Sequence, residues 1–192
     1  MKSAKGKRPG WVGPLVFLLC VVVAGLGFRL VWLPHMYPRE HRAAVEQWAA
    51  EYDLPRSLVY AVIKTESDFD PEANSLKDAR GLMQILHSTG SWAAENLELE
   101  DYTESSLYDV DTNIRIGCWY LARLYQQFGS LSAALAAYNA GEGNVTRWLA
   151  QPEYSDDGKT LKEIPYPETA DYVETVLVRQ TIYEKLYESK LW

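Results

Sequence analysis

The sequence predicts an all-α protein, in which a compact helical domain follows a single N-terminal transmembrane helix. Three observations lead to this prediction. A long uncharged stretch lies near the N-terminus, apolar residues recur at helical spacing through the rest of the chain, and no segment alternates convincingly as a strand would. With 192 residues, of which 47% are hydrophobic, the chain has enough apolar material for one modest packed domain and an appendage.

The N-terminal segment has the composition of a membrane anchor. Residues 12–28 carry no charge, and residues 30–33 continue the apolar run beyond Arg29, whose long side chain can reach the membrane interface. Pro34 and Pro38 are expected to stop the helix. The expected boundaries are a basic tail over residues 1–10, an anchor over residues 11–33 and a linker over residues 34–38.

The basic groups before the apolar run indicate its orientation. The positive-inside rule keeps the tail in the cytoplasm and exports the domain, which would make the protein a single-pass protein of the cell membrane with its domain outside the cytoplasm. A cleaved secretory signal is the alternative, although the run is longer than the usual signal core of about 7–15 residues.

The exported part of the chain is strongly acidic. The chain holds 19 basic and 26 acidic groups, and residues 1–33 contain five of the basic groups and no acid, so the remainder carries a formal charge of −12. Nucleic acid is therefore not an expected partner, because phosphate contacts need Lys and Arg. The only cysteine outside the anchor, Cys118, has Ile114 and Leu121 at helical spacing, which predicts a buried thiol. No Cys, His or Asp cluster has metal-ligand spacing, so we expect neither metal nor cofactor.

The remaining residues read as a series of helices separated by loops. Pro55 suits a first helical turn, Asp111 is the expected N-cap of the strongest helix and Gly129 its stop. Loops are expected over residues 67–80 and 152–167, which are rich in loop-forming residues. The expected helices span residues 39–52, 55–66, one or two segments within 81–96, then 111–128, 131–140, 144–151 and 168–189.

Glu66 closes an apolar helical pattern directly before a polar loop. The helix dipole disfavours negative charge at a C-terminus, and apolar neighbours such as Val62 and Phe69 would raise the pKa of the carboxyl group further by desolvation. A carboxylic acid that stays protonated near neutral pH can protonate the oxygen of a glycosidic bond. From its position alone, a solvated glutamate at a helix end remains the alternative.

Glu66 begins the first of three separated blocks of sequence that together resemble a known family. The first block reads ESDFDPEANS from Glu66 and continues as GLMQI from Gly81, the second reads AAYNAGEGNVTRW from Ala136, and the third reads IPYPETADYV from Ile164. In these blocks the chain resembles the lytic transglycosylases of the soluble-transglycosylase (SLT) domain family, which are related to goose-type lysozyme. The resemblance covers about residues 40–187, and it implies a lysozyme-like helical catalytic domain over residues 39–192.

The resemblance also implies roles for individual residues. Glu66 would be the single catalytic acid and base, and the substrate-binding residues would be Ser75, Gly81, Met83, Gln84, Tyr138, Asn139, Glu168 and Tyr172. Ser75 would bond the sugar substituents, and Gly81 would let the backbone approach the glycan closely. Met83 and Gln84 would line the cleft, with core filling and a surface amide as their respective alternatives.

The second and third blocks would contribute to the same cleft. Tyr138 would orient the acid or hydrogen-bond to it, and Asn139 would contact substrate or fix the helix end before Gly141. Glu168 would help to bind substrate and would complement the dipole of the last helix, without acting as a nucleophile. Tyr172, one turn later, would point at the same cleft.

The implied reaction is cleavage of the β-1,4 bond between N-acetylmuramic acid and N-acetylglucosamine in peptidoglycan. Glu66 would protonate the leaving oxygen and then remove the proton of the muramic 6-hydroxyl, which attacks internally and leaves a 1,6-anhydromuramic end. A hydrolytic muramidase is the near alternative, and a non-catalytic peptidoglycan-binding scaffold is the distant one. The expected partners are peptidoglycan strands and the membrane through the N-terminal helix, and a tethered enzyme suggests cell-wall synthesis or secretion machinery as a further hypothesis.

Overall fold

The computed structural model describes residues 11–188. The chain divides into two compact units, with the boundary between Pro38 and Arg39. The predicted basic tail over residues 1–10 and the predicted end of the last helix at residue 189 lie outside the described residues.

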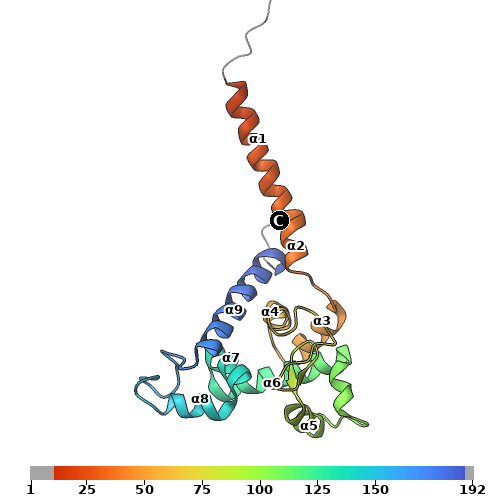
Figure 1. The fold of residues 1–192 in the computed structure, drawn as a ribbon, viewed down its shortest axis with the longest axis vertical. Helices are drawn as coiled ribbons and strands as arrows, with labels where there is room; N and C mark the ends of the chain where they lie inside the picture. The colour runs from red at the N-terminus through yellow and green to blue at the C-terminus, as the bar shows by residue number, and fades with distance from the viewer. Residues whose placement is uncertain (1–10, 189–192) are drawn as a thin grey trace, which may run out of the picture. The chain divides into compact units, whose positions relative to one another are not determined.

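The described part of the first unit is one helix of 25 residues, from Val12 to Met36 (Figure 1). It consists of α1 (Val12–Gly27), a π-helical segment η1 (Phe28–Trp32) and α2 (Leu33–Met36). The mean hydropathy of its most apolar window is 2.4, and none of that window is buried within the protein. By length and composition, this helix is able to cross a membrane.

The predicted helix stop at Pro34 is wrong. Pro34 lies in the first turn of α2, and the helix continues to Met36. The preceding turn is widened, so that the Leu33 N–H donates to the Phe28 carbonyl five residues back. The widened turn already departs from the regular four-residue bonding that a proline would break, so the helix passes through Pro34.

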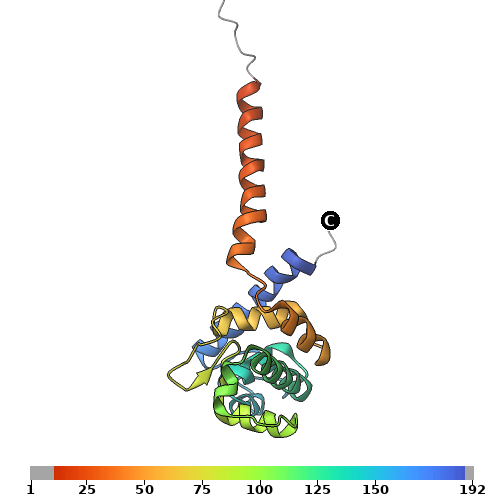
Figure 2. The same cartoon turned by 90° about the vertical axis from the view of Figure 1, so that its right-hand side faces the viewer.

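The second unit is almost entirely helical (Figures 1 and 2), as predicted. Its elements in chain order are α3 (Arg42–Glu51), α4 (Arg56–Glu66), β1 (Ala79–Arg80), β2 (Ile85–Leu86), α5 (His87–Asn96), the 3-10 turn η2 (Glu104–Tyr108), α6 (Val110–Phe128), α7 (Leu131–Ala140), α8 (Glu142–Leu149), α9 (Pro167–Tyr183) and the π-helical segment η3 (Glu184–Glu188).

The core of this unit forms around α4, α6 and α7. Every residue of α4 from Ser57 to Ile63 is buried, and the largest contact between helices joins α4 to α9. In α7 the five residues 133–137, four of them alanines, are fully buried, because small side chains let α6 and α9 approach closely. Cys118 of α6 is buried too, as predicted, and burial raises the pKa of its thiol.

Several helix ends follow the local signals in the sequence. Glu66 is the last residue of α4, and α7 has the predicted bounds. Gly129 ends α6 in the left-handed conformation, with φ of 65°, which glycine adopts without strain.

Several helix starts differ from the prediction, among them that of α3, which begins at Arg42 rather than at residue 39. The N-cap of α6 is Asp109 rather than Asp111, since the Asp109 side chain accepts a hydrogen bond from the Thr112 N–H at 2.9 Å. The helix α8 begins at Glu142, two residues early, because Gly141 alone makes the turn with φ of 90°.

The strands β1 and β2 form a short antiparallel pair that the sequence did not reveal. Ala79 lies opposite Leu86, and Arg80 lies opposite Ile85. Two residues in each strand are too few to produce a visible alternation of polar and apolar residues. This hairpin follows the long loop after α4 and brings residues 73–86 back beside the C-terminus of that helix.

Candidate active site

The C-terminus of α4 fixes the position of Glu66 through contacts with two distant segments. The Arg179 Nη1 group of α9 donates to the Lys64 carbonyl at 2.7 Å. The Ser67 hydroxyl donates to the Leu82 carbonyl of the hairpin at 2.8 Å. The first bond occupies a carbonyl that the helix end leaves without a helical partner, and the two bonds together tie the end of α4 to both α9 and the hairpin.

The carboxyl group of Glu66 is partly buried, and burial raises its pKa to about 7. The neighbouring Tyr172 hydroxyl opposes this effect, because its interaction with the carboxylate lowers the pKa. With a pKa of about 7, roughly half of the Glu66 groups carry a proton at neutral pH. The acid that the sequence predicts is thus available for proton transfer in both directions.

Two tyrosines, Tyr138 and Tyr172, interact electrostatically with Glu66. Burial raises the pKa values of Tyr138 and Tyr172 well above the ordinary value, and the Glu66 charge adds to the rise in both. The Tyr138 hydroxyl donates to the Met83 carbonyl at 2.8 Å, so its proton is not directed at the acid. The Tyr172 hydroxyl is buried and makes no hydrogen bond within the usual distance and angle in the described chain. Glu66 is the carboxyl group whose charge raises the pKa of Tyr172.

Two adjoining depressions meet at Glu66 and form an open cleft. Both are lined by Glu66, Ser75 and Gln84. The first, here called the Tyr138 pocket, has a volume of about 340 Å3 and is also lined by Leu76, Lys77, Ala79, Leu86, Tyr138, Asn139 and Glu168. The second, the Arg179 pocket, has a volume of about 570 Å3 and is also lined by Lys64, Thr65, Ser67, Asp68, Ala73, Asn74 and Arg179. Each is large enough for a small ligand, and the acid lies where they join.

Ser75 and Gln84 lie in the middle of the cleft, and their own loop uses part of their bonding capacity. Ser75 Oγ accepts hydrogen bonds from two backbone N–H groups, which leaves its hydroxyl proton for a ligand. Gln84 Nε2 donates to the carbonyls of Ala73 and Gly81, which leaves Oε1 as the group that can accept from a ligand. Gln84 has φ of 47°, and these side-chain bonds hold it in that uncommon conformation.

Gly81 and Met83 do not border the cleft, and their predicted roles need correction. A Cβ atom on Gly81 would lie 2.2 Å from the Leu107 carbonyl oxygen, and φ is +70°, so glycine is required here by the packing against η2 rather than by a glycan. Met83 is fully buried, and its side chain lies against Gly117 of α6. Met83 is thus a core residue, and its link to the site is the backbone carbonyl that accepts from Tyr138.

Asn139 and Glu168 line the Tyr138 pocket from the end of α7 and the start of α9. Asn139 Oδ1 accepts from the Thr169 hydroxyl at 2.8 Å, which joins the two helices and leaves Nδ2 as the donor for a ligand. Glu168 is exposed in the first turn of α9, where the helix dipole favours a carboxylate. Both of its predicted roles are compatible with this position.

Asn113 is a structurally important residue that the sequence analysis did not single out. This buried amide of α6 accepts from the Met83 N–H and donates to the carbonyls of Arg80 and Leu107, all at 2.7–2.9 Å. It therefore holds the hairpin on α6. A polar residue beside Ile114, on the apolar side of an amphipathic helix, was the available signal. Arg179 and Thr169 were also missed, because their partners lie 30 or more residues away in the chain.

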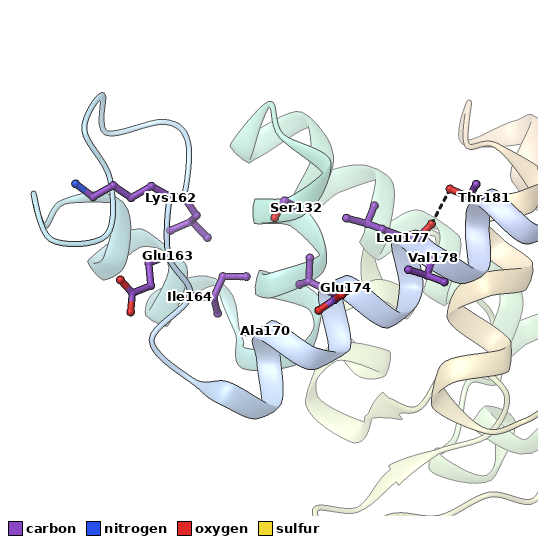
Figure 3. Close-up of a pocket in the computed structure, with 11 residues that line it drawn as sticks. Ser132, Lys162, Glu163, Ile164, Ala170, Glu174, Leu177, Val178 and Thr181 are labelled. Atoms are coloured by element: carbon purple, nitrogen blue, oxygen red, sulfur yellow. Dashed lines mark hydrogen bonds between the residues drawn. The ribbon is translucent and has the colours of Figure 1, made fainter.

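A separate groove lies along α9, between that helix, α7 and the loop that precedes α9 (Figure 3). Ser132, Ile164 and Leu177 are among its lining residues, and none of the predicted site residues is. Within residues 11–188, no three His, Cys, Asp or Glu side chains are grouped as a metal ion would require. The acid at the end of α4 therefore marks the candidate site.

Comparison with known proteins identifies the family of the chain. Residues 43–161 match the family model described as "Transglycosylase SLT domain". The chain belongs to this family. The match covers α4, the hairpin and α7, and the chain continues beyond it through α9.

Curated relatives of this SLT domain include soluble and membrane-bound proteins. The chain is 34% identical over 154 residues to the soluble lytic murein transglycosylase of Escherichia coli (strain K12). The aligned region covers 79% of this chain and 24% of that protein. It is 31% identical over 157 residues to the membrane-bound lytic murein transglycosylase C of Yersinia pestis (strain Pestoides F). This aligned region covers 76% of this chain and 43% of that protein. The chain thus spans about a quarter of the length of the Escherichia coli relative.

Solved structures share the fold of the SLT domain. The 70 kDa soluble lytic transglycosylase from Escherichia coli aligns with a TM-score of 0.73 and 28% identity, over 94% of this chain and 30% of that one. An inactive Glu-to-Gln mutant of the lytic transglycosylase Slt from Pseudomonas aeruginosa aligns with a TM-score of 0.71 and 30% identity, over 90% of this chain and 29% of that one. The predicted all-α, lysozyme-like class and the predicted family are confirmed.

Proposed function

We propose that this protein is a peptidoglycan lytic transglycosylase with Glu66 as its only acid and base. One observation carries the proposal: a carboxyl group with a pKa of about 7 stands in an open cleft, where it is flanked by polar groups with free bonding capacity. The names of the relatives support the substrate, since they are murein transglycosylases. The inactive Pseudomonas aeruginosa mutant supports a single essential glutamate.

The reaction begins with proton transfer from Glu66 to the oxygen that bridges N-acetylmuramic acid and N-acetylglucosamine. The muramic acetamido group stabilises the anomeric centre as the bridging bond breaks. Glu66, now a carboxylate, removes the proton of the 6-hydroxyl of the same sugar, and that oxygen attacks the anomeric carbon. The products are a 1,6-anhydromuramic end and a new N-acetylglucosamine end, and Glu66 regains its proton. A pKa near the working pH suits a group that must first give and then take a proton.

The other site residues act on the substrate or on the acid. Ser75, Gln84 and Asn139 offer one donor or acceptor each to sugar hydroxyl and acetamido groups. Glu168, which lines the Tyr138 pocket, binds sugar and is not a nucleophile. Tyr172 is a positioning residue that supports the carboxylate in the second half of the reaction.

The N-terminal helix is proposed to anchor the enzyme. A helix of 25 residues, with basic residues before it in the sequence, suits an uncleaved single-pass anchor with the catalytic domain outside the cytoplasm. A relative is by name membrane-bound. Such a tether would confine cutting to wall near the membrane, beside wall-synthesis or secretion machinery. Membrane fractionation after alkaline extraction tests the anchor, and release of the chain as a shorter soluble product would instead indicate a cleaved signal.

Mass spectrometry of the released muropeptides tests the reaction. The full-length chain in detergent is incubated with purified peptidoglycan, and we expect products that are lighter by one water than hydrolytic products. Products with reducing ends would assign a hydrolytic muramidase, and the absence of soluble products would favour a binding scaffold. Glu66→Gln should release nothing, whereas the matched variant Glu168→Gln should release the same anhydro products more slowly.

A further inference from the structure

The guanidinium group of Arg179 uses only one of its nitrogens within the protein. Nη1 donates to the Lys64 carbonyl at 2.7 Å and to the Thr65 hydroxyl at 3.1 Å. Nε and Nη2 make no hydrogen bond in the described chain, and neither is among the buried polar atoms without a partner, so both reach solvent. Because the bonded nitrogen fixes the guanidinium plane, the two open nitrogens form a preset fork at the edge of the Arg179 pocket.

This guanidinium also lacks a counter-ion. Among residues 11–188, no carboxylate lies within 4 Å of Arg179, whereas the other cation of the pocket, Lys64, is paired with Asp68. The pKa of Glu66 is determined by burial and by Tyr172, with no contribution from Arg179, so the catalytic carboxyl is not its partner. With Glu66 protonated, the pocket retains one uncompensated positive charge in a part of the chain whose formal charge is −12.

We propose that Arg179 binds a carboxylate of the substrate strand, beside the bond that Glu66 cleaves. The proposal rests on the proposed function and adds a requirement to it. A guanidinium fork matches the two oxygens of a carboxylate, and a partly buried position strengthens such a bond. In peptidoglycan the carboxylate has two sources. It belongs to the stem peptide where a peptide is attached, and to the lactyl group of muramic acid where the peptide has been removed. A neutral sugar offers none.

Binding to an inactive enzyme tests the proposal without depending on cleavage. The full-length Glu66→Gln variant in detergent is titrated with three ligands of equal sugar number: peptide-bearing glycan, glycan freed of peptides by an amidase, and a chito-oligosaccharide without lactyl groups. Adding Arg179→Gln should weaken binding of a carboxylate-bearing ligand about tenfold, as expected for one charge-assisted bond, and leave the chito-oligosaccharide unaffected. Loss confined to the peptide-bearing ligand identifies the stem peptide as the source, and loss confined to the peptide-free glycan identifies the lactyl group.

The control variant changes the same charge elsewhere. Arg42→Gln removes an exposed guanidinium that pairs with Glu46 on α3, and it should leave all three affinities unchanged. Equal losses for all three ligands with Arg179→Gln would overturn the proposal, because they would mean that Arg179 acts by supporting the end of α4. Unchanged affinities would overturn it as well.

A second variant keeps the test decisive if Arg179→Gln does not fold. Arg179→Lys retains the charge and loses the fork, so a reduced but salt-sensitive preference for the carboxylate ligand over the chito-oligosaccharide supports the proposal. Affinities equal to those of the parent variant for both ligands contradict it. Absence of cleavage by the wild-type chain would instead contradict the proposed function, because the binding measurement uses no catalysis.

Discussion

Tyr172→Phe should move the pH dependence of cleavage upward. The Tyr172 hydroxyl lies beside the Glu66 carboxyl and favours its charged form, while burial favours the neutral form and dominates. Removing the hydroxyl eliminates the favourable interaction and leaves burial in place, because phenylalanine keeps the ring. The pKa of Glu66 should therefore rise further above its present value of about 7.

The size of the effect follows from the geometry. A hydrogen bond to a charged group contributes roughly 1.5–3 kcal/mol, and the lower end applies here, because the Tyr172 hydroxyl lowers the Glu66 pKa without making a hydrogen bond of regular geometry. Since about 1.4 kcal/mol corresponds to one pH unit, the shift should be about one unit. The protonated form of Glu66 starts the reaction, so the alkaline limb of kcat/KM should move upward by that amount.

The assay is release of soluble fragments from peptidoglycan across a pH series, with kcat/KM fitted for the wild type and the variant. Tyr60→Phe is the matched control, because Tyr60 also has a buried hydroxyl without a partner, and its pKa shows no coupling to Glu66. The control should leave the alkaline limb in place. A Tyr172→Phe profile that superimposes on the wild type, or one that moves to lower pH, would refute the account of how Glu66 is tuned.

Three further predictions concern stability. The pKa of Glu66 in the folded protein, about 7, exceeds the ordinary 4.5, so the folded state is destabilised as the pH rises and Glu66 loses its proton. The free energy of unfolding of Glu66→Gln, measured in urea, should exceed that of the wild type by on the order of 3 kcal/mol at pH 9 and equal it at pH 4. A difference that does not change with pH would contradict this. Asn113→Ala should cost on the order of 3 kcal/mol of unfolding free energy, because three backbone groups, two of them in buried bonds, lose their partner. A loss below about 1 kcal/mol would show that the hairpin does not depend on Asn113. Gly81→Ala should lower the free energy of unfolding by about 2 kcal/mol or more in the same assay, because the added Cβ atom would clash with the Leu107 carbonyl oxygen. An unchanged free energy of unfolding would be inconsistent with the packing described.

Much of the fold was predictable because its signals are local. Gly129 and the bounds of α7 follow from the chemistry of helix ends, and the apolar pattern of α4 predicted both the helix and its end at Glu66. The widened turn before Pro34 was not predictable, because it depends on a shift in backbone bonding that no single residue type announces. The short hairpin was missed for the opposite reason, since it has too little sequence to show a pattern.

The candidate site was predictable in part. Some of the residues that line the cleft, such as Ser75 and Gln84, were among the predicted set, whereas others, such as Arg179, were not. Gly81 and Met83 were assigned to substrate although both face the core, because a sequence block does not tell which way a residue points. The residues that hold the site together, such as Asn113, bond to partners far along the chain, so only the folded structure reveals them.

The protonation of Glu66 itself is the central claim, and it can be measured without any substrate. The protein is labelled with carbon-13 at glutamate side-chain carboxyl groups, and the signal that disappears in Glu66→Gln is followed by NMR through a pH titration. The account predicts a midpoint near 7, well above the ordinary 4.5. A midpoint at or below the ordinary value would mean that Glu66 is a carboxylate at neutral pH and cannot supply the proton that the proposed reaction requires.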